Sequence, residues 1–283
     1  MSDLDWFSGL PQRPWTKSSI RSLKHAILEG SSAVDSLSYQ DVSVWYSMAL
    51  ALVVSRIKDA CPSIISTSID TSFRVKTIDT LRGKLKRQST YSINRIHDVM
   101  GVRLVGKMSL SEQDMLANSL AKLFDNAEIS DMRETGHSGY RAVHLAIILP
   151  NSVCAEVQIR TTLQDEWANC YELAADIFGR RIRYGEYPDN EEQKQIVEIL
   201  QNLSLEEIKA CENDTNEIAK VKKKTKGLLE KVRKMGIRDP EVIKSSNDLS
   251  EALLHASQVT DQREQVLKVM IKGTRQYLEQ YSV

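Results

Sequence analysis

The clearest pattern of apolar and polar positions lies in residues 155–161, which read Ala-Glu-Val-Gln-Ile-Arg-Thr. Apolar and polar residues alternate there, which predicts a strand that buries its apolar side. Glu156, Gln158 and Arg160 then share the opposite side of the strand. An acid, an amide and a cation on one surface indicate a binding or catalytic site.

Helical spacing of apolar residues predicts two helices near the N-terminus. The first is expected to begin after Thr16 and to stop at Gly30. The second begins at an approximate capping box in residues 38–41, Ser-Tyr-Gln-Asp, and is expected to end at Cys61-Pro62.

Helices and strands alternate in the middle of the chain. The patterns predict helices over residues 73–88, 111–124 and 163–178, and strands over residues 94–105, 140–149 and 153–160. This alternation predicts a mixed α/β fold of the α+β kind, with helical extensions at both ends. The sequence Gly-Glu-Tyr-Pro-Asp at residues 185–189 is expected to mark a domain boundary.

The C-terminal third is predicted to be wholly helical. Apolar spacings of three and four form a stripe made of Ile218, Val221, Thr225, Leu228, Val232 and Met235. Such a stripe packs inside its own domain or against a second copy, so a homo-oligomer is the alternative to internal packing. Residues 220–234 hold eight basic residues and one acidic residue. This basic run is either a solvated helix face or a contact for RNA.

Composition sets broad limits on this picture. The 283 residues are 41% hydrophobic and 27% charged, which is enough for a sizeable core. Thirty-eight basic residues balance thirty-eight acidic ones, so net charge neither favours nor excludes a polyanionic partner. Four widely separated cysteines lack metal or disulfide spacing, which indicates a reducing, cytoplasmic setting. The apolar run at residues 42–54 is too short to span a membrane.

Positive charge is concentrated in residues 74–107, which carry nine Lys or Arg and two Asp. The excess is either a solvated helix surface or a phosphate-binding surface. Asp98 opens a predicted strand beside this charge and suits a Mg²⁺ ligand. Asp98 and Arg103 fall on opposite faces of an ideal strand. A shared site therefore needs Asp98 to precede the strand, which we expect, or a bulge at Gly101.

Other residue types narrow the chemistry. Five histidines give no ligand set for a metal phosphohydrolase, and no P-loop sequence occurs. Tyr140 suits stacking on a base, whereas His144 is either a buried structural histidine or a site residue. Glu156 supplies a second carboxylate. Two acids beside a basic wall suit a magnesium nucleotide.

Four motifs, taken together and in order, resemble those of RelA/SpoT-like alarmone synthetases. They lie at residues 74–76, 96–103, 139–144 and 156–161. The resemblance implies a nucleotidyltransferase-like mixed sheet flanked by helices in a synthetase core over residues 71–187. Helical regions over residues 1–70 and 188–283 would flank this core. Such enzymes transfer the β,γ-pyrophosphate of ATP to a ribose 3′-hydroxyl of GDP or GTP, making (p)ppGpp and AMP.

The resemblance also implies a role for each motif residue. Asp98 and Glu156 would be catalytic and would bind Mg²⁺, and Glu156 would assist the metal or deprotonate the acceptor hydroxyl. ATP would be bound by Arg74, Lys76, Lys84 and Arg103. The acceptor would be bound by Tyr140, His144, Gln158 and Arg160.

The acceptor side departs from the family pattern. Many relatives carry lysines before the Gly-Tyr step, where this chain has Arg-Glu-Thr-Gly-His-Ser at residues 133–138, and Tyr171-Glu172 stands where a Glu-His pair is expected. Residues 164–168 resemble the toxic small alarmone synthetases, some of which pyrophosphorylate the 3′ end of tRNA. The acceptor is therefore a guanosine nucleotide, an adenosine nucleotide giving (p)ppApp, or the tRNA CCA end. A toxin would add an antitoxin protein as partner, while a degenerate, non-enzymatic module is disfavoured because both acids are present.

Overall fold

The computed structural model describes residues 7, 9–88, 90–149, 152–236 and 239–281. Residues 1–6 and 282–283, at the outer ends of the two predicted helical extensions, lie outside the described residues. Contacts divide the chain into two compact units. The first unit comprises Met1–Lys107, Gln113–Met132 and Ala142–Arg160, and the second comprises Met108–Glu112, Arg133–Arg141 and Thr161–Val283.

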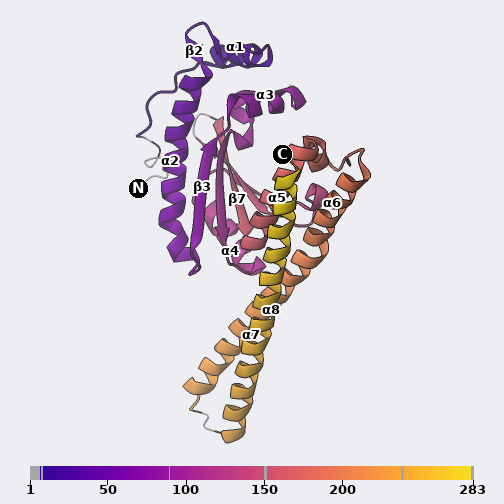
Figure 1. Cartoon of the computed structure of the whole chain (residues 1–283). Coiled ribbons are helices and arrows are strands. Elements are labelled where there is room, and N and C mark those ends of the chain that lie inside the picture. The colour runs from indigo at the N-terminus through magenta and orange to yellow at the C-terminus, as the bar shows by residue number, and fades with distance from the viewer. Residues whose placement is uncertain (1–6, 8, 89, 150–151, 237–238, 282–283) are drawn as a thin grey trace. The chain divides into compact units, whose positions relative to one another are not determined.

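A five-stranded mixed sheet forms the centre of the first unit, in the order β3-β4-β7-β6-β5 (Figure 1). The pairs β3–β4, β5–β6 and β6–β7 are antiparallel. Burial alternates along β4 and β6, so one face of the sheet is packed in the core and the other carries polar side chains. The strands are β3 (Ile69–Val75), β4 (Met100–Gly106), β5 (Ala127–Asp131), β6 (Val143–Leu149) and β7 (Val153–Thr161).

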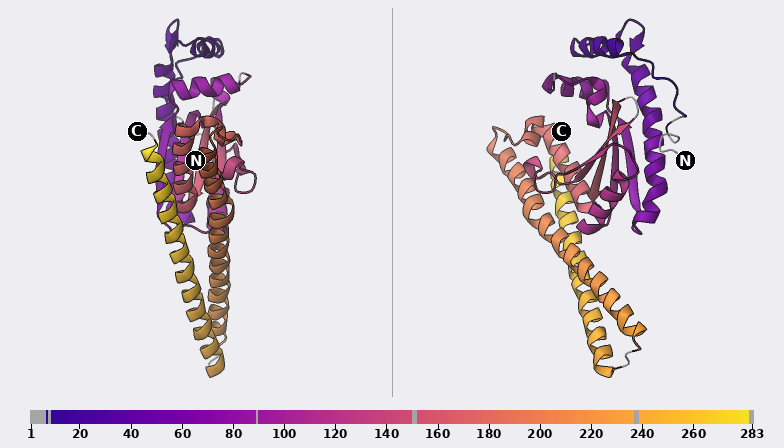
Figure 2. Two further views of the ribbon diagram at one scale, coloured as in Figure 1. Left: turned by 45° about the vertical axis from the view of Figure 1, so that its right-hand side comes forward. Right: turned by 180° about the vertical axis from the view of Figure 1, so that it is seen from behind.

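Helices flank this sheet, which confirms the predicted mixed α/β fold. Capping boxes at Thr16 and Ser38 open the first two helices, as the sequence predicts. The long helix α2 packs along β3 and β4 (Figures 1 and 2). The helices are α1 (Lys17–Leu28), α2 (Tyr39–Ile64), α3 (Ile78–Arg87) and α4 (Leu110–Ala121), and β1 (Ala33–Val34) pairs with β2 (Leu37–Ser38) before α2.

The second unit is helical, as predicted for the C-terminal third. Its helices are α5 (Thr162–Phe178), α6 (Glu191–Asn202), a π-helical turn η7 (Leu203–Ile208), α7 (Lys209–Lys234) and α8 (Pro240–Gln280). Helices α7 and α8 form a hairpin, and α8 also packs on α5 (Figure 2). Their shared core includes Trp167, Leu200, Leu267, Ile271 and Leu278.

The predicted stripe on α7 is buried only in part. Ile218, Thr225 and Val232 are half-buried. Leu228 and Met235 are 62% and 73% exposed. Internal packing therefore accounts for one part of the stripe, and the homo-oligomer stays a prediction. Among the described residues, no helix combines the length and apolar character that crossing a bilayer requires.

Three predicted elements were wrong in part. Residues 73–75 belong to strand β3 rather than to a helix, because all seven residues of β3 pair with β4. Helix α2 continues past Pro62 to Ile64, since Ile65 N donates to Cys61 O and closes the last turn. Strand β6 begins at Val143, because positive φ angles just before Tyr140 turn the chain there. The sequence patterns also missed β5.

Candidate functional site

Three polar side chains form a hydrogen-bonded row along β7 in the first unit. Arg160 Nη2 donates to Gln158 Oε1 at 3.0 Å, and Gln158 Nε2 donates to Glu156 Oε2 at 2.9 Å. The alternation predicted from the sequence is therefore confirmed. Each amide or guanidinium fixes the rotamer of its neighbour, so the row presents Glu156 in one orientation.

His144 joins the row from the neighbouring strand. The register of β6 and β7 sets His144 opposite Gln158, and its Nδ1 lies 3.4 Å from Glu156 Oε1. Burial would raise the pKa of Glu156. Hydrogen bonds from His144 and Gln158, with the charges of His144 and Lys84, outweigh burial and lower the pKa of this carboxyl to about 2. Glu156 is therefore a stable anion in the free protein, and His144 belongs to this row.

The free energy of unfolding is expected to fall as the pH is lowered from about 4.5 to about 2, because Glu156 becomes protonated. Glu156→Gln should lack this part of the pH dependence. Glu156 has a pKa of about 2 in the folded protein, against an ordinary value of 4.5 for a glutamate carboxyl. In this window the unfolded state binds more protons, so the stabilisation is complete above the unfolded pKa and is lost as pH falls through the folded pKa. The full difference corresponds to roughly 3 kcal/mol. Urea denaturation of both proteins across this range measures it, and identical pH profiles would contradict the assignment.

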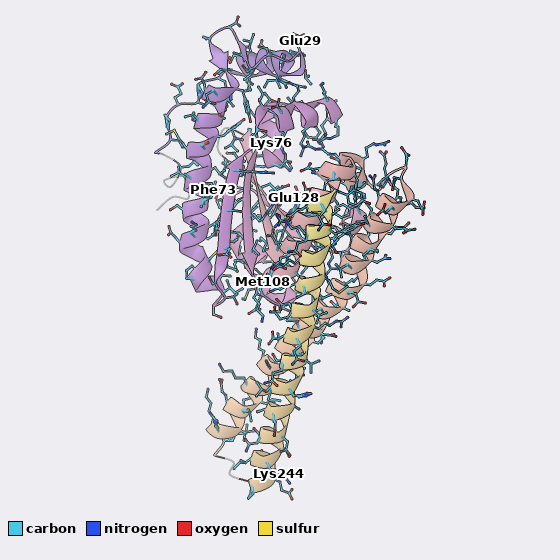
Figure 3. The ribbon with its side chains drawn as sticks, in the orientation of Figure 1. Glu29, Phe73, Lys76, Met108, Glu128 and Lys244 are labelled. Carbon is cyan, nitrogen blue, oxygen red and sulfur yellow. The ribbon has the colours of Figure 1, made fainter. Side chains whose placement is uncertain are left out.

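Asp98 lies between two lysines in the first unit. It occupies a 3₁₀ turn, His97–Val99, directly before β4, as expected if it is to share a site with Arg103. Lys84 Nζ on α3 lies 2.8 Å from Asp98 Oδ1, and Lys76 Nζ lies 3.1 Å from Asp98 Oδ2. Figure 3 labels Lys76 in the segment that joins β3 to α3. Tyr39 OH donates to the backbone oxygen of Lys76 and anchors this segment on α2.

A cleft of about 220 Å³ brings these groups together. Its lining includes Arg74, Lys76, Asp98, Arg103, Glu156 and Gln158. The register of β3 and β4 pairs Arg74 with Gly101 and Ser72 with Arg103, so the two arginines project from the same face of the sheet. Three cations and two carboxylates from four segments of the chain therefore line one cleft. Phe73, which is 51% exposed, also borders the cleft.

The donor set of the cleft fits a metal held jointly with a ligand rather than by the protein alone. Among the described residues, no group of three or more His, Cys, Asp or Glu side chains could hold a metal ion. Asp98 Oδ1 is buried and has no hydrogen bond of regular geometry, although Lys84 pairs with it. Mg²⁺ bound with nucleotides uses one or two carboxylates together with phosphate oxygens and water. Asp98 and Glu156 match that donor count.

Tyr140 lies in the second unit, outside any strand, on a segment held from three sides. Gly139 has a φ of +85°, and a Cβ there would come within 3.0 Å of the Trp167 ring. Ser204 Oγ donates to Gly139 O at 2.6 Å. Trp167 is itself fixed, because its Nε1 donates to Leu200 O at 2.6 Å. The half-buried ring of Tyr140 packs against the core of this unit.

A buried ion pair continues this segment, and sequence reasoning did not single it out. Arg141 Nη2 lies 2.6 Å from Glu212 Oε2, and the two side chains are only 2% and 5% exposed. Thr161 Oγ1 donates to the second carboxylate oxygen of Glu212. Glu212 lies four residues after Ile208 and directly after Cys211, both of which are buried. An acid within an apolar stripe was the signal available in the sequence.

Comparison with known proteins identifies part of the chain. Residues 73–175 match the family model described as "Region found in RelA / SpoT proteins". Uncharacterised proteins of Mycobacterium tuberculosis and Mycobacterium bovis are each 41% identical to this chain over 179 residues. That match covers 62% of this chain and 64% of each relative. The chain therefore spans less than two thirds of the length of these relatives.

Two solved structures are similar to this chain. The small alarmone synthetase 2 from Bacillus subtilis superposes with a TM-score of 0.50 and 23% identity, over 64% of this chain and 98% of that one. The small alarmone synthetase 1 from Bacillus subtilis, bound to its product pppGpp, gives a TM-score of 0.49 and 18% identity, over 66% and 97%. At this level of identity, the likeness to the first of these establishes the architecture only.

Proposed function

Because residues 73–175 form a RelA/SpoT-type region, we propose that the protein is an ATP-dependent pyrophosphotransferase. It transfers the β,γ-pyrophosphate of ATP to the ribose 3′-hydroxyl of a guanosine nucleotide, producing a (p)ppGpp-type alarmone and AMP. The observation that carries this proposal is the cleft where Arg74, Lys76 and Arg103 face Asp98 and Glu156. Phosphoryl-type transfer depends mainly on positioning and charge neutralisation, which this residue set supplies.

The cations of the cleft would hold the donor. Arg74 and Arg103 offer planar guanidinium forks that match phosphate oxygens, whereas Lys76 and Lys84 act as point charges. Both lysines are paired with Asp98 in the free protein. When ATP binds together with a metal ion, the two lysines would pair with phosphate groups instead of with Asp98. Asp98 would then be free to bind the metal ion. When bound, Mg²⁺ would neutralise charge that develops on the transferred group.

Glu156 suits an electrostatic role better than that of a general base. A general base works best with a pKa near the working pH, whereas the pKa of Glu156 is about 2. As a stable carboxylate, Glu156 would bind the metal or accept the hydrogen bond of the acceptor 3′-hydroxyl. His144, Gln158 and Arg160 would keep it charged and oriented.

Transfer of label tests the proposal directly. Purified protein is incubated with ATP labelled at the γ-phosphate and, in separate reactions, with GDP, GTP, unlabelled ATP or deacylated tRNA. We expect label on GDP or GTP together with release of AMP. Label on adenosine nucleotides alone would identify (p)ppApp synthesis. A protein that labels none of the four acceptors in the presence of Mg²⁺ would contradict the proposal.

Tyr140→Ala is expected to raise the KM for the acceptor about tenfold, with the KM for ATP changed less than about twofold. The reason is that stacking of a base on an aromatic ring contributes about 1–3 kcal/mol. Steady-state kinetics with each substrate varied in turn measures the two constants. Tyr140→Phe is the matched control, because it keeps the ring and should keep the acceptor KM. Equal losses in both variants would assign the effect to the hydroxyl group instead.

A second candidate acceptor is the CCA end of tRNA, and charge on the second unit favours it. The basic half of α7 exposes Lys222, Lys223 and Lys224, as an RNA contact requires. In the segment before Tyr140, Glu134 pairs with Lys209 at 2.6 Å. Residues 133–138 also contain no lysine, although many relatives are expected to use lysines there to meet acceptor phosphates. Label on tRNA alone in the transfer assay would select this candidate.

A further inference from the structure

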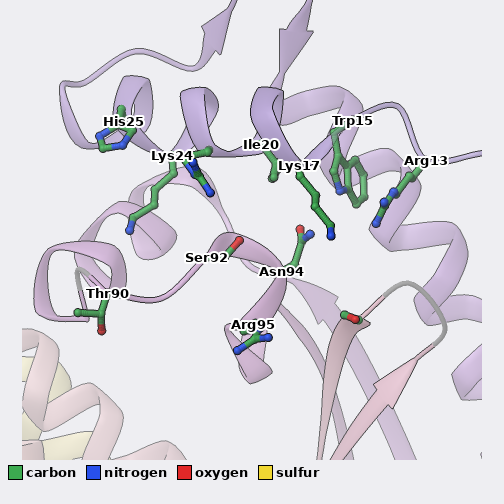
Figure 4. Close-up of a pocket in the computed structure, with 12 residues that line it drawn as sticks. Arg13, Trp15, Lys17, Ile20, Lys24, His25, Thr90, Ser92, Asn94 and Arg95 are labelled. Atoms are coloured by element: carbon green, nitrogen blue, oxygen red, sulfur yellow. The ribbon is translucent and has the colours of Figure 1, made fainter.

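A second basic cavity lies in the first unit, and it shares no lining residue with the cleft described above. Its volume is about 700 Å³, within the range of small-molecule sites. Figure 4 shows side chains entering it from α1 and its preceding segment on one side, and from residues 90–95 on the other. The cavity is therefore formed by segments far apart in the sequence.

Positive charge dominates the wall of this cavity. Five cations line it, namely Arg13, Lys17, Arg21, Lys24 and Arg95, and His25 adds an imidazole. No described residue that lines it is acidic. Helix α1 begins at Lys17 without an acidic residue in its first turn, so the positive end of its dipole adds to the charge. A single phosphate group would compensate only part of this charge.

A buried donor in the wall is independent evidence for a ligand. Trp15 is 3% exposed, and its Nε1 has no hydrogen-bond partner among the described residues. Indole N–H groups donate only, and buried donors are nearly always paired, so this atom calls for an acceptor oxygen. The ring is held by edge contacts to Trp45 and Tyr46, with centroids 5.1 and 5.3 Å away. Trp15 is therefore a rigid residue of this wall whose buried N–H lacks an acceptor among the described residues.

Neutral donors complete the set. Tyr46 OH donates to Asn94 Oδ1 at 3.0 Å, which leaves the amide nitrogen of Asn94 to donate. Ser92 and Thr90 add hydroxyl groups. In Figure 4, Lys17 and Asn94 extend toward each other from opposite walls. Forked, point-charge and neutral donors that converge on one cavity are what a group with many acceptor oxygens requires.

We infer that this cavity is a second binding site, which takes a small ligand carrying at least two linked phosphate groups. Inorganic pyrophosphate and nucleoside diphosphates share this chemistry. The site goes beyond the proposed transfer reaction, and its occupancy does not depend on that reaction. The volume of about 700 Å³ and the buried Trp15 in the wall favour a small ligand over an RNA backbone, which binds along extended basic grooves.

Calorimetric titration of the full chain with pyrophosphate and with ADP tests this site. Lys17→Gln/Arg21→Gln is expected to weaken binding at one site at least tenfold, and Trp15→Phe is expected to weaken the same binding event. The control Lys58→Gln/Lys122→Gln removes two exposed lysines of the same unit and should bind as the unaltered protein does. Arg103→Gln removes a cation of the cleft only, so it should leave this binding event unchanged.

The arms of the experiment separate the alternatives. Equal affinity for pyrophosphate and ADP would show that the phosphate groups are sufficient for binding. Tighter binding of ADP would show that the cavity also recognises the nucleoside. Affinity for pyrophosphate and ADP that Lys17→Gln/Arg21→Gln leaves unchanged would overturn the inference. A protein that binds a 5′-phosphorylated RNA 12-mer through Lys17 and Arg21, but neither small ligand, would overturn it as well. None of these results depends on whether label is transferred from ATP.

Discussion

Asp98→Asn is expected to reduce kcat for pyrophosphate transfer at least about a thousandfold, because it removes the charge that would hold the metal in the cleft. The substitution keeps the shape of the side chain, but its single remaining oxygen can accept a hydrogen bond from only one of Lys76 and Lys84, which pair with separate oxygens of Asp98. Both lysines and both arginines remain to bind phosphates. ATP affinity should therefore change little while turnover is lost, and steady-state kinetics with equilibrium binding of ATP measures the two quantities.

Asp79→Asn is the matched control for this prediction. Asp79 lies on α3 in the same unit, is 80% exposed, and pairs with Arg82 rather than with a cation of the cleft. Exposed pairs contribute little, so this variant should keep full activity. An Asp98→Asn protein that retained a tenth or more of the activity would remove Asp98 from the metal role. Thermal melting of both variants checks that loss of turnover is not loss of folding.

Local patterns in the sequence predicted the parts of the cleft that local geometry creates. The period of two in β7 places Glu156, Gln158 and Arg160 on one face whatever the neighbouring strands are. The spacing of Asp98 and Arg103 predicted that the acid precedes the strand, because a shared site allowed few alternatives. Neither pattern could predict that Lys76 and Lys84 close on Asp98 from either side. That arrangement depends on where α3 packs, which is a tertiary property.

Long-range pairing explains the errors. Residues 73–75, Phe-Arg-Val, are too few to separate a strand end from a helix start, and pairing with β4 holds them in a sheet. The pattern of its neighbours predicts a strand at Tyr140, whereas the positive φ of Ser138 and Gly139 turns the chain before β6. The basic cavity joins residues 13–25 with residues 90–95. No spacing rule links segments so far apart in the sequence. The sequence alone therefore indicates only separate charged residues and not a shared cavity.

Glu212→Gln is expected to destabilise the protein by about 3–5 kcal/mol, the range found when one partner of a buried ion pair is removed. The substitution leaves the Arg141 guanidinium buried without its counter-charge. Arg141 Nε already lacks a hydrogen-bond partner among the described residues, and the bond from Nη1 to Arg133 O, at 3.3 Å, supplies no negative charge. The Thr161 hydroxyl would also exchange a carboxylate acceptor for a neutral amide. Urea denaturation followed by circular dichroism measures the loss.

Two further variants separate a buried pair from a general effect of charge. Glu217→Gln lies on the same helix but has a side chain 67% exposed beside Lys220, so it should cost less than about 0.5 kcal/mol. Arg141→Met/Glu212→Leu removes both charges and should be clearly more stable than Glu212→Gln, because no unpaired charge remains buried. If the double variant lost as much stability as its two single variants together, the two residues would contribute independently, and their charge pairing would not explain the loss. Arg141 directly follows Tyr140, so the KM for the acceptor should also be measured in the double variant. An unchanged KM in a stable double variant would limit the ion pair to a role in folding.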